Sequence, residues 1–424
     1  MTLALFILMM VLLLGSVPVY VSLGLSATVV LALFTSLPLE VLAQRMFSGI
    51  DKFSLMAVPF FILAANVMKG GGLSIRILKL AQALVGHYKG GLAMTVVLAC
   101  MFFGAVSGSS PATVIAIGGL MLPALRNANY GEAFSLGLIT SSSAVAVIIP
   151  PSIGMIVYGS VTGTSVGDLF MAGLGPGILF GGVFMLYSVY HARKHKIEAL
   201  PRSSLREVWG AFKDAGWALG IPVLILGGIY GGFFTPTEAA AVASVYAIFV
   251  SLFIYKDLNL KGLWDETYES AIGTAQVMIL LAAASVFSWL LTRQQVPQAM
   301  TEVLMSISNS KFAILMMINV LLLITGMFID PASSTTILAP LLLPLALSYG
   351  IDPVHLGIIM VVNGAIGMYT PPFGLNLFVA TGISTVSISR IIRGVIPFII
   401  LSLITMALVT YIPMISLWLP QMMK

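Results

Sequence analysis

The chain has 424 residues, of which 59% are hydrophobic and 8% charged, and its formal net charge is +5. Soluble domains carry about 25% charged residues, so this composition excludes a soluble globular protein and predicts an all-α polytopic membrane protein. Continuous apolar runs, without alternation in segments of about ten residues, disfavour a β-barrel. No basic stripe with interleaved aromatics indicates nucleic-acid binding, and the single cysteine, Cys100, excludes an internal disulfide.

The first half of the chain, residues 1–206, is predicted to be one structural repeat. Its apolar segment 2–34, interrupted at Pro18, is long enough to cross the membrane once, and the amphipathic stretch 38–52 is suited to the membrane interface. In chain order the predicted parts are scaffold helices (1–69), an arm (70–90), a re-entrant hairpin (91–127), a broken span (131–165), a span (167–191) and a cytoplasmic linker (192–206).

A connecting span, 207–235, is predicted to lead into a second repeat, 236–424. Thr235 and Glu238 have the spacing of a capping box at the start of the next helix. Residues 256–269 are polar and match the interfacial stretch of the first half. The predicted parts are scaffold helices (236–291), an arm (292–310), a hairpin (311–349), a broken span (353–384) and the last span (388–420).

Matching prolines indicate that the two halves arose by internal duplication. The interval from Pro150 to Pro371 is the same as the interval from Pro123 to Pro344. Basic residues place the linker between the halves in the cytoplasm under the positive-inside rule. Because one extra span joins the halves, the two repeats are then inverted, which suits a carrier that exposes one site to two sides alternately.

Small, hydroxyl-rich and proline-bearing segments interrupt both hairpins and both broken spans. Broken helices free backbone carbonyls, and such loops persist in a membrane when they are buried or bind something. Hard cations such as Na⁺ accept neutral oxygens, and helix N-termini suit a carboxylate. The alternative for any single serine is close helix packing. The predicted Na⁺ ligands are Ser107, Ser109, Ser143, Val145, Ile148 and Pro150 in the first half, and Asp330, Ala365, Gly367, Thr370 and Pro371 in the second.

Five further residues are predicted to bind substrate: Ser110, Ser152, Ser334, Asn376 and Arg293. Two of the predicted ligands, Asp330 for Na⁺ and Arg293 for the substrate, also have an alternative interpretation. Asp330 is an intramembrane acid, which indicates a functional site, but it can also cap the helix that follows. Arg293 can meet an anion or extend from its helix end to the interface. No catalytic constellation, metal-spaced His/Cys cluster or nucleotide loop occurs, which predicts a non-enzymatic protein without a cofactor, driven by an ion gradient.

Six motifs resemble those of the large membrane subunit of the tripartite ATP-independent periplasmic (TRAP) transporters, and together they cover nearly the whole chain. They are Pro59-Phe-Phe61, Gly90-Gly-Leu92, Ser107-Gly-Ser-Ser110, Ile149-Pro-Pro-Ser152, Gly232-Phe-Phe-Thr-Pro-Thr-Glu-Ala-Ala240 and Tyr369-Thr-Pro-Pro372. Some members of this family carry an acid just after the first hairpin tip. Pro111-Ala-Thr113 has none, so no carboxylate ligand is assigned to the first ion site.

The resemblance implies a Na⁺-coupled, elevator-type importer in the bacterial inner membrane, surrounded by membrane lipids. It also implies a small membrane subunit (Q-type), a periplasmic substrate-binding protein (P-type), and an organic acid substrate such as a C4-dicarboxylate or sialic acid. A channel, a carrier that works without a binding protein, a membrane scaffold and an intramembrane enzyme are the alternatives. Uptake that requires a Na⁺ gradient would separate transport from the last two.

Overall fold

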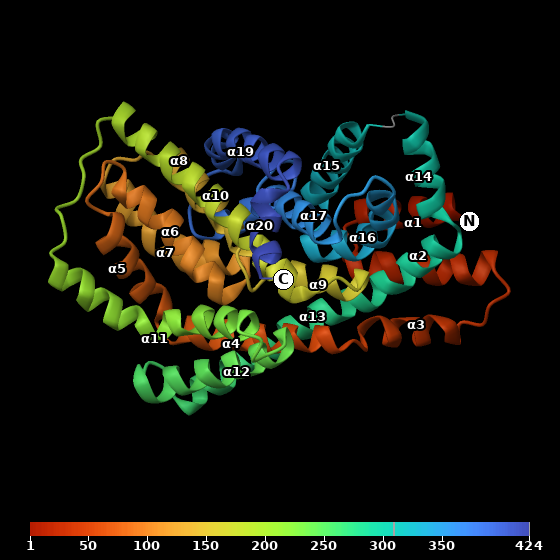
Figure 1. The fold of residues 1–424 in the computed structure, drawn as a ribbon, viewed down its shortest axis with the longest axis horizontal. Helices are drawn as coiled ribbons and strands as arrows, with labels where there is room; N and C mark the ends of the chain where they lie inside the picture. The colour runs from red at the N-terminus through yellow and green to blue at the C-terminus, as the bar shows by residue number, and fades with distance from the viewer. Residues whose placement is uncertain (308–309, 424) are drawn as a thin grey trace.

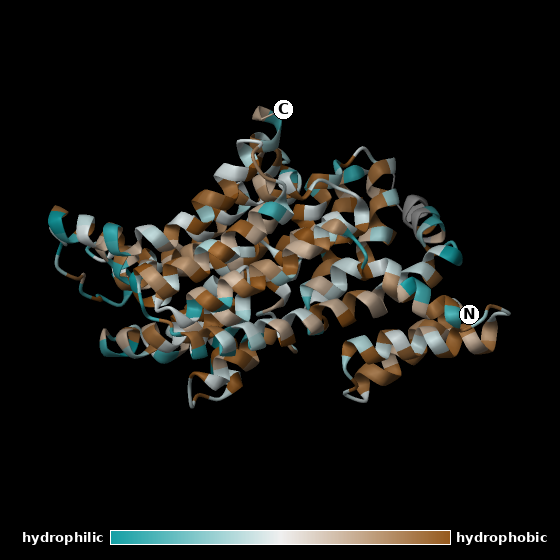
Figure 2. Cartoon of the chain, turned by 90° about the horizontal axis from the view of Figure 1, so that it is seen from below, coloured by the Kyte–Doolittle hydropathy of each residue, from teal (hydrophilic) through white to brown (hydrophobic). Residues whose placement is uncertain are grey.

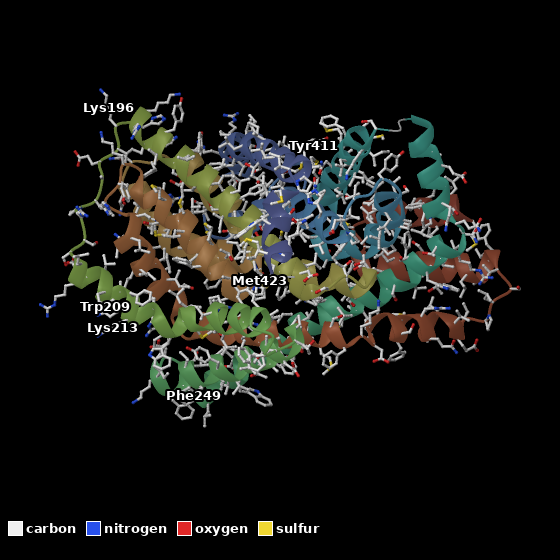
Figure 3. All side chains as sticks on the ribbon, viewed as in Figure 1. Lys196, Trp209, Lys213, Phe249, Tyr411 and Met423 are labelled. Carbon is white, nitrogen blue, oxygen red and sulfur yellow. The ribbon has the colours of Figure 1, made fainter. Side chains whose placement is uncertain are left out.

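The computed structural model describes residues 1–307 and 310–423, and every regular element in those residues is a helix. Eight helices in this part of the chain are long and apolar enough to cross a membrane. Polar residues gather at the end of the molecule where α10 (Val166–Lys194) leads into α11 (Leu205–Tyr230) (Figure 2). Lys196, Trp209 and Lys213 lie at that end (Figure 3). The prediction of an all-α polytopic membrane protein is confirmed.

The helices of the first half precede α11 and include one short 3₁₀ turn on each side of the first hairpin. They are α1 (Thr2–Leu14), α2 (Val19–Phe34), α3 (Glu40–Ile50), η1 (Phe53–Met56), α4 (Ala57–Gly70), α5 (Leu73–Val85), α6 (Gly91–Ser107), α7 (Ser110–Asn127), α8 (Glu132–Ala144), η2 (Val145–Val147), α9 (Ile153–Thr162) and α10. The first hairpin is therefore α6 and α7, and the first broken span is α8, η2 and α9.

The second half begins at α12, whose predicted capping box is confirmed by hydrogen bonds between Thr235 and Glu238 in both directions. Its helices are α12 (Pro236–Phe249), η3 (Val250–Ile254), α13 (Leu260–Arg293), α14 (Val296–Ile307), α15 (Lys311–Phe328), α16 (Pro331–Ser348), α17 (Pro353–Gly367), α18 (Leu375–Gly382), α19 (Ile388–Tyr411) and α20 (Met414–Met422). The second hairpin is α15 and α16, and the second broken span is α17 and α18.

Helix boundaries repeat with the interval that separates the matching prolines. The helix α7 begins at Ser110, and α16 begins at Pro331, which is one such interval later. The helix α6 ends at Ser107, and α15 ends at Phe328, again one interval later. The two halves therefore share the same local structure through their hairpins.

Three predicted segments differ from the observed helices. Residues 2–34 form two helices that fold back on each other, not one span, because the 13-residue α1 is about 20 Å long and Pro18 stops the chain from continuing it. Residues 256–269 are not a separate arm, since α13 runs without a break from Leu260. The last segment, 388–420, divides at Pro413 into α19 and α20.

Two groups of helices meet along α13. The helices α2, α3 and α4 pack against it, and α4 also packs against α12. Figure 1 shows α3 lying beside α13 along one edge of the molecule. On its other side α13 contacts α16 of the second hairpin, which in turn packs against α9 of the first broken span. This arrangement brings the hairpins and broken spans of both halves together on one side of α13.

The first arm, α5, is fastened to the neighbouring helices by one arginine. Arg76 pairs with Asp257 at 2.6 Å and with Asp214 of α11 at 3.4 Å. Its guanidinium also lies 3.8 Å from the ring centre of Tyr255, where cation–π attraction adds to the ion pairs. The arm is thus attached to α11 and to the segment that precedes α13.

Candidate functional site

The tips of both hairpins and the bends of both broken spans surround one cavity of about 410 Å³. Its residues come from five places in the chain: Gly108–Pro111, Val147 with Ser152–Gly154, Asp330–Ala332 with Thr335, Val361 with Met368 and Leu375, and Gln276, Val277 and Leu280 of α13. Four of the predicted site residues, Ser109, Ser110, Ser152 and Asp330, therefore lie at one cavity, although they belong to different halves of the chain.

A glycine allows the first hairpin tip to approach the first broken span. Gly108 has φ +57°, and a Cβ atom there would lie 2.6 Å from the carbonyl oxygen of Pro151, so only glycine fits. The hydroxyl of Thr113 donates to the carbonyl of Ser109 at 2.7 Å, and the amide of Ser109 is 3.4 Å from the hydroxyl of Ser107. The tip is thus shaped by its own hydroxyl groups. The Pro150–Pro151 and Pro371–Pro372 peptide bonds in the facing bends are both cis.

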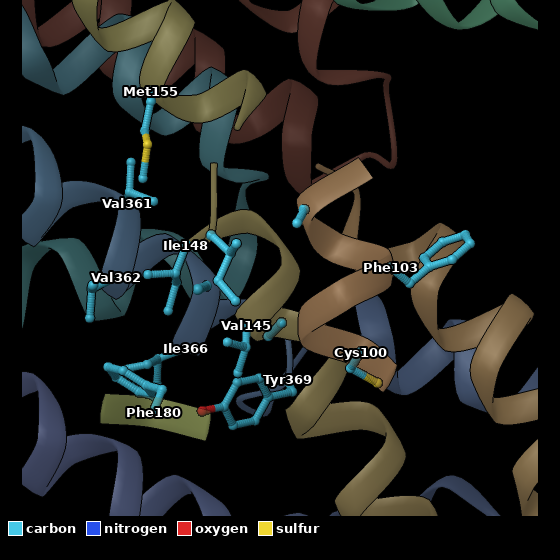
Figure 4. Packing of buried hydrophobic residues seen from close by; sticks show 14 of the residues in the cluster. Cys100, Phe103, Val145, Ile148, Met155, Phe180, Val361, Val362, Ile366 and Tyr369 are labelled. Carbon is cyan, nitrogen blue, oxygen red and sulfur yellow. The ribbon is translucent and has the colours of Figure 1, made fainter. Parts of the chain in front are cut away.

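The remaining ion ligands predicted in the first half differ in how free their oxygens are. The hydroxyl of Ser143 lies 3.7 Å from the sulfur of Cys100 on α6. The side chains of Val145 and Ile148 point into the apolar core beside Tyr369 and Ile366 (Figure 4), so these residues can offer a cation only their carbonyls. The carbonyl of Val145 already accepts hydrogen bonds from the amides of Ile148 and Ile149. Pro150 is buried in the bend itself.

Asp330 caps α16, as its alternative interpretation predicts, and it also lines the cavity. Its carboxylate accepts hydrogen bonds from the amides of Ala332 and Ser333, each at 3.0 Å, and from the hydroxyl of Ser333. A capping carboxylate keeps further lone pairs, so the cap leaves capacity for a cation. The structure therefore fits both interpretations of this residue.

The other ligands predicted in the second half lie where α15 and α17 approach each other. A Cβ atom on Gly367 would lie 2.4 Å from the carbonyl carbon of Gly326. Ala365, two residues earlier on α17, is also buried. The hydroxyl of Thr370 donates to the carbonyl of Ile366 at 2.6 Å, which leaves its lone pairs available. Pro371 follows directly, in the bend.

The predicted substrate residues lie in three separate places. Asn376 and Ser110 are fully buried and hydrogen bonded to each other at 2.6 Å, and Ser152 is buried at the cavity. Ser334 faces its own hairpin partner, with its hydroxyl 3.5 Å from that of Thr325. Arg293 lies apart from them all, at the last residue of α13, about 20 Å along the helix from Leu280.

Arg293 contributes to a different surface pocket. Its guanidinium lies 5.7 Å from the ring centre of Trp289, over which Arg45 of α3 also stacks at 4.8 Å. Both arginines line a pocket beside α3, outside the cavity between the tips. In this structure Arg293 thus interacts at a helix end and is not brought to the other predicted substrate residues.

Several buried oxygens of the two broken spans lack a hydrogen-bond partner among the described residues. They are the hydroxyls of Thr140, Ser141, Ser142 and Ser152 and the side-chain oxygen of Asn376. A buried polar oxygen without a partner is costly, and Ser152, which lines the cavity, can therefore accept a hydrogen bond from a molecule bound there. Sequence reasoning singled out Ser152 and Asn376 but not Thr140, Ser141 or Ser142, although they stand directly before Ser143 in a hydroxyl-rich run.

Sequence reasoning also missed the contribution of α13 to the cavity. Gln276 lies within an apolar stretch from Ala271 to Leu291, and it lines the cavity together with Val277 and Leu280. A lone amide in a membrane span is the signal that would have found it, since polar groups in the membrane are costly and mark functional positions.

Comparison with known proteins decides the family. Residues 6–415 match the family described as the tripartite ATP-independent periplasmic transporter, DctM component. The chain belongs to the DctM family. The predicted resemblance to the large TRAP subunit is therefore confirmed, as is the prediction of a multi-pass protein of the bacterial inner membrane.

Two curated proteins illustrate the DctM family. The C4-dicarboxylate TRAP transporter large permease protein DctM of Rhodobacter capsulatus is 43% identical over 435 residues, covering 99% of this chain and 99% of its own. The sialic acid TRAP transporter large permease protein SiaM of Vibrio cholerae is 38% identical over 411 residues, covering 97% of this chain and 96% of its own.

One solved structure has a fold similar to the one described above. The YdaH transporter of Alcanivorax borkumensis has a TM-score of 0.66, with 15% sequence identity, over 95% of this chain and 98% of that protein. At this identity the likeness extends to the fold alone.

Proposed function

We propose that this DctM-family chain is the carrier subunit for Na⁺-coupled import of a small organic acid across the bacterial inner membrane. The observation that carries the proposal is the meeting of two hairpin tips and two broken spans at one cavity beside α13. Interrupted helices at matching places in two repeats are typical of transporter binding sites. The relatives named for C4-dicarboxylate and for sialic acid support the choice of organic acids.

Two Na⁺ ions are proposed to bind at the two tips. The first would take oxygens of Ser107, Ser109 and the bend at Pro150, and the second would take Asp330 and oxygens around Gly367. Ion binding would use lone pairs that the hydrogen bonds leave available, such as those of the Asp330 carboxylate. Loading of the ions would thereby complete the cavity for the substrate carboxylate, which is the physical basis proposed for coupling.

The proposed motion is an elevator movement. The two hairpins and two broken spans would move as one transport unit, which packs internally through α9 with α16 and α7 with α18. The helices α2, α3, α4, α12 and α13 would remain as a stationary scaffold. Because the unit carries few charges along its contact with α13, its movement would expose little buried charge to the membrane.

Two partners are proposed, a small membrane subunit and a periplasmic substrate-binding protein, since the family is one component of a tripartite transporter. The helix α3 buries none of its own residues in this chain. Phe47 on this helix and Leu39 directly before it are exposed apolar side chains, which suit contact with the small subunit or with lipid.

Uptake by proteoliposomes would test the proposed function. The chain is reconstituted with the small subunit and supplied with the binding protein and radiolabelled C4-dicarboxylate or sialic acid. We expect accumulation against a gradient only when Na⁺ is higher outside, with K⁺ as the control. Equal uptake without a Na⁺ gradient, or single-channel currents in a planar bilayer, would overturn it. Uptake in the absence of the binding protein would favour the alternative of a carrier that works without one.

A cysteine crosslink tests the elevator movement separately. Thr336 of α16 and Ser288 of α13 line one cavity of about 240 Å³ between the two groups of helices. In a Cys100→Ser background, cysteines at these two positions are joined with a short bifunctional reagent. We expect uptake to stop while Na⁺ binding persists. Transport at the full rate in the crosslinked protein would instead indicate a local gating motion.

A further inference from the structure

The polar groups around the cavity come almost entirely from the hairpins and broken spans. Ser109, Ser110, Ser152, Asp330 and Thr335 all belong to those elements. From α13 the cavity receives two apolar side chains, Val277 and Leu280, and one amide, that of Gln276. Gln276 is therefore the polar group with which α13 faces the cavity in the described part of the chain.

The position of Gln276 on α13 is fixed by helix spacing. Gln276 and Leu280 are four residues apart, so they lie on one face of the helix. That face is directed at the cavity, as the lining by both residues shows. The side chain of Gln276 is exposed, and none of the described residues forms a hydrogen bond with it. Its donor and acceptor are thus available to a molecule in the cavity.

The charge around the cavity makes a neutral amide useful. Among the described residues that line it, none is Lys or Arg. The one carboxylate, Asp330, is engaged by two backbone amides and a hydroxyl. In this conformation, hydrogen bonds from neutral groups are therefore the contacts with which the cavity can distinguish an organic acid from its analogues.

We infer that Gln276 is a specificity-determining residue, which hydrogen bonds an oxygen of the organic acid in the conformation seen here. The inference rests on the proposed function and adds one consequence to it. Because α13 belongs to the scaffold, this contact is made in one state of the transport cycle and breaks when the transport unit moves away. Gln276 therefore selects the substrate at one side of the membrane, whereas the serines at the tips accompany it throughout.

Uptake kinetics with three variants test the assignment. Gln276→Leu keeps the approximate size of the side chain and removes its hydrogen bonds, and Gln276→Glu adds a charge of the same sign as the substrate. Thr274→Ala is the matched control, since Thr274 lies on the same helix and does not line the cavity. We expect Gln276→Leu to raise the apparent KM about tenfold with a maximal rate within about twofold, and Gln276→Glu to lose uptake of the acid. Thr274→Ala should match the unmodified chain.

Competition with analogues that lack single oxygens completes the test. If Gln276 hydrogen bonds one oxygen of the acid, the analogue that lacks this oxygen should compete poorly for uptake by the unmodified chain. In Gln276→Leu the same analogue should compete about as well as the parent acid. An unchanged KM and unchanged analogue ranking in Gln276→Leu would overturn the inference while leaving Na⁺-coupled transport intact. Absence of Na⁺-driven uptake in the unmodified chain would overturn the proposed function itself. Gel filtration of each variant checks that it folds.

Discussion

The side-chain amide of Asn376 donates a hydrogen bond to the hydroxyl of Ser110 over 2.6 Å and a second one to the carbonyl of Thr140 over 3.1 Å. Asn376 lies at the start of α18 in the second broken span, whereas Ser110 begins α7 in the first hairpin. All of these groups are buried. One side chain thus joins the second half of the chain to the hairpin tip and the broken span of the first half.

The Asn376–Ser110 bond is expected to stabilise the association of the two halves. Asn376→Leu removes both hydrogen bonds and leaves buried partners unsatisfied, which costs about 1–3 kcal/mol. We therefore expect a lower melting temperature in detergent. In a double-mutant cycle with Ser110→Ala, the two losses should not add. Strictly additive losses would show that the two side chains act independently.

Substitution of Asp330 separates its capping role from ion binding. Asp330→Asn keeps an oxygen that accepts from the amides of Ala332 and Ser333 but removes the charge. If the carboxylate binds Na⁺, thermal stability should change little while the Na⁺ concentration for half-maximal uptake rises about tenfold or more. Asp330→Ala should impair both properties.

Asp352→Asn provides the matched control for Asp330. Asp352 caps α17 in the same manner, through the amides of Val354 and His355, and it does not line the cavity. Its variant should keep the Na⁺ dependence of the unmodified chain. If Asp330→Asn also keeps the Na⁺ dependence of the unmodified chain, Asp330 acts only as the cap of α16 and does not bind Na⁺.

Close contact between α6 and η2 makes Gly104 intolerant of a side chain. A Cβ atom at Gly104 would lie 2.5 Å from the Cα atom of Ala146, so Gly104→Ala should cost about 1–3 kcal/mol through overpacking and reduce uptake. Gly119→Ala is the control on the same hairpin, because nothing lies within 4 Å of its Cβ position. That variant should be neutral or stabilising by up to about 1 kcal/mol. Equal melting temperatures of the two variants would contradict the close contact.

Phe47 is expected to contact the small membrane subunit. Its side chain is 71% exposed on α3, whereas Leu42 packs partly against the helices around α13 and is less suitable for a surface test. Phe47→Gln should reduce co-purification of the small subunit without changing the melting temperature of this chain. Phe249→Gln on α12 is the control, since Phe249 is also exposed and lies elsewhere on the molecule (Figure 3). Equal co-purification with both variants would place the contact elsewhere.

Local composition was sufficient to predict the hairpins and the breaks. Glycine, proline and small hydroxyl residues interrupt helices wherever they gather, and the duplicated prolines fixed the same interruptions in both halves. Predicted hairpins at 91–127 and 311–349 therefore agree with α6–α7 and α15–α16. The same local reasoning predicted that residues 256–269 are separate from the span that follows, because it interpreted their polar side chains as a helix boundary. Polarity alone does not end a helix, and α13 continues through it.

By itself the sequence determined the membrane class, the matching helix breaks in the two halves and the position of Asp330 as a possible helix cap, because each of these depends on neighbouring residues. Only the tertiary structure decided that Asn376 meets Ser110, that Gln276 reaches the cavity and that Arg293 does not. Such contacts join segments up to 266 residues apart. They follow from how the helices pack against α13, and no local pattern of residues contains that information.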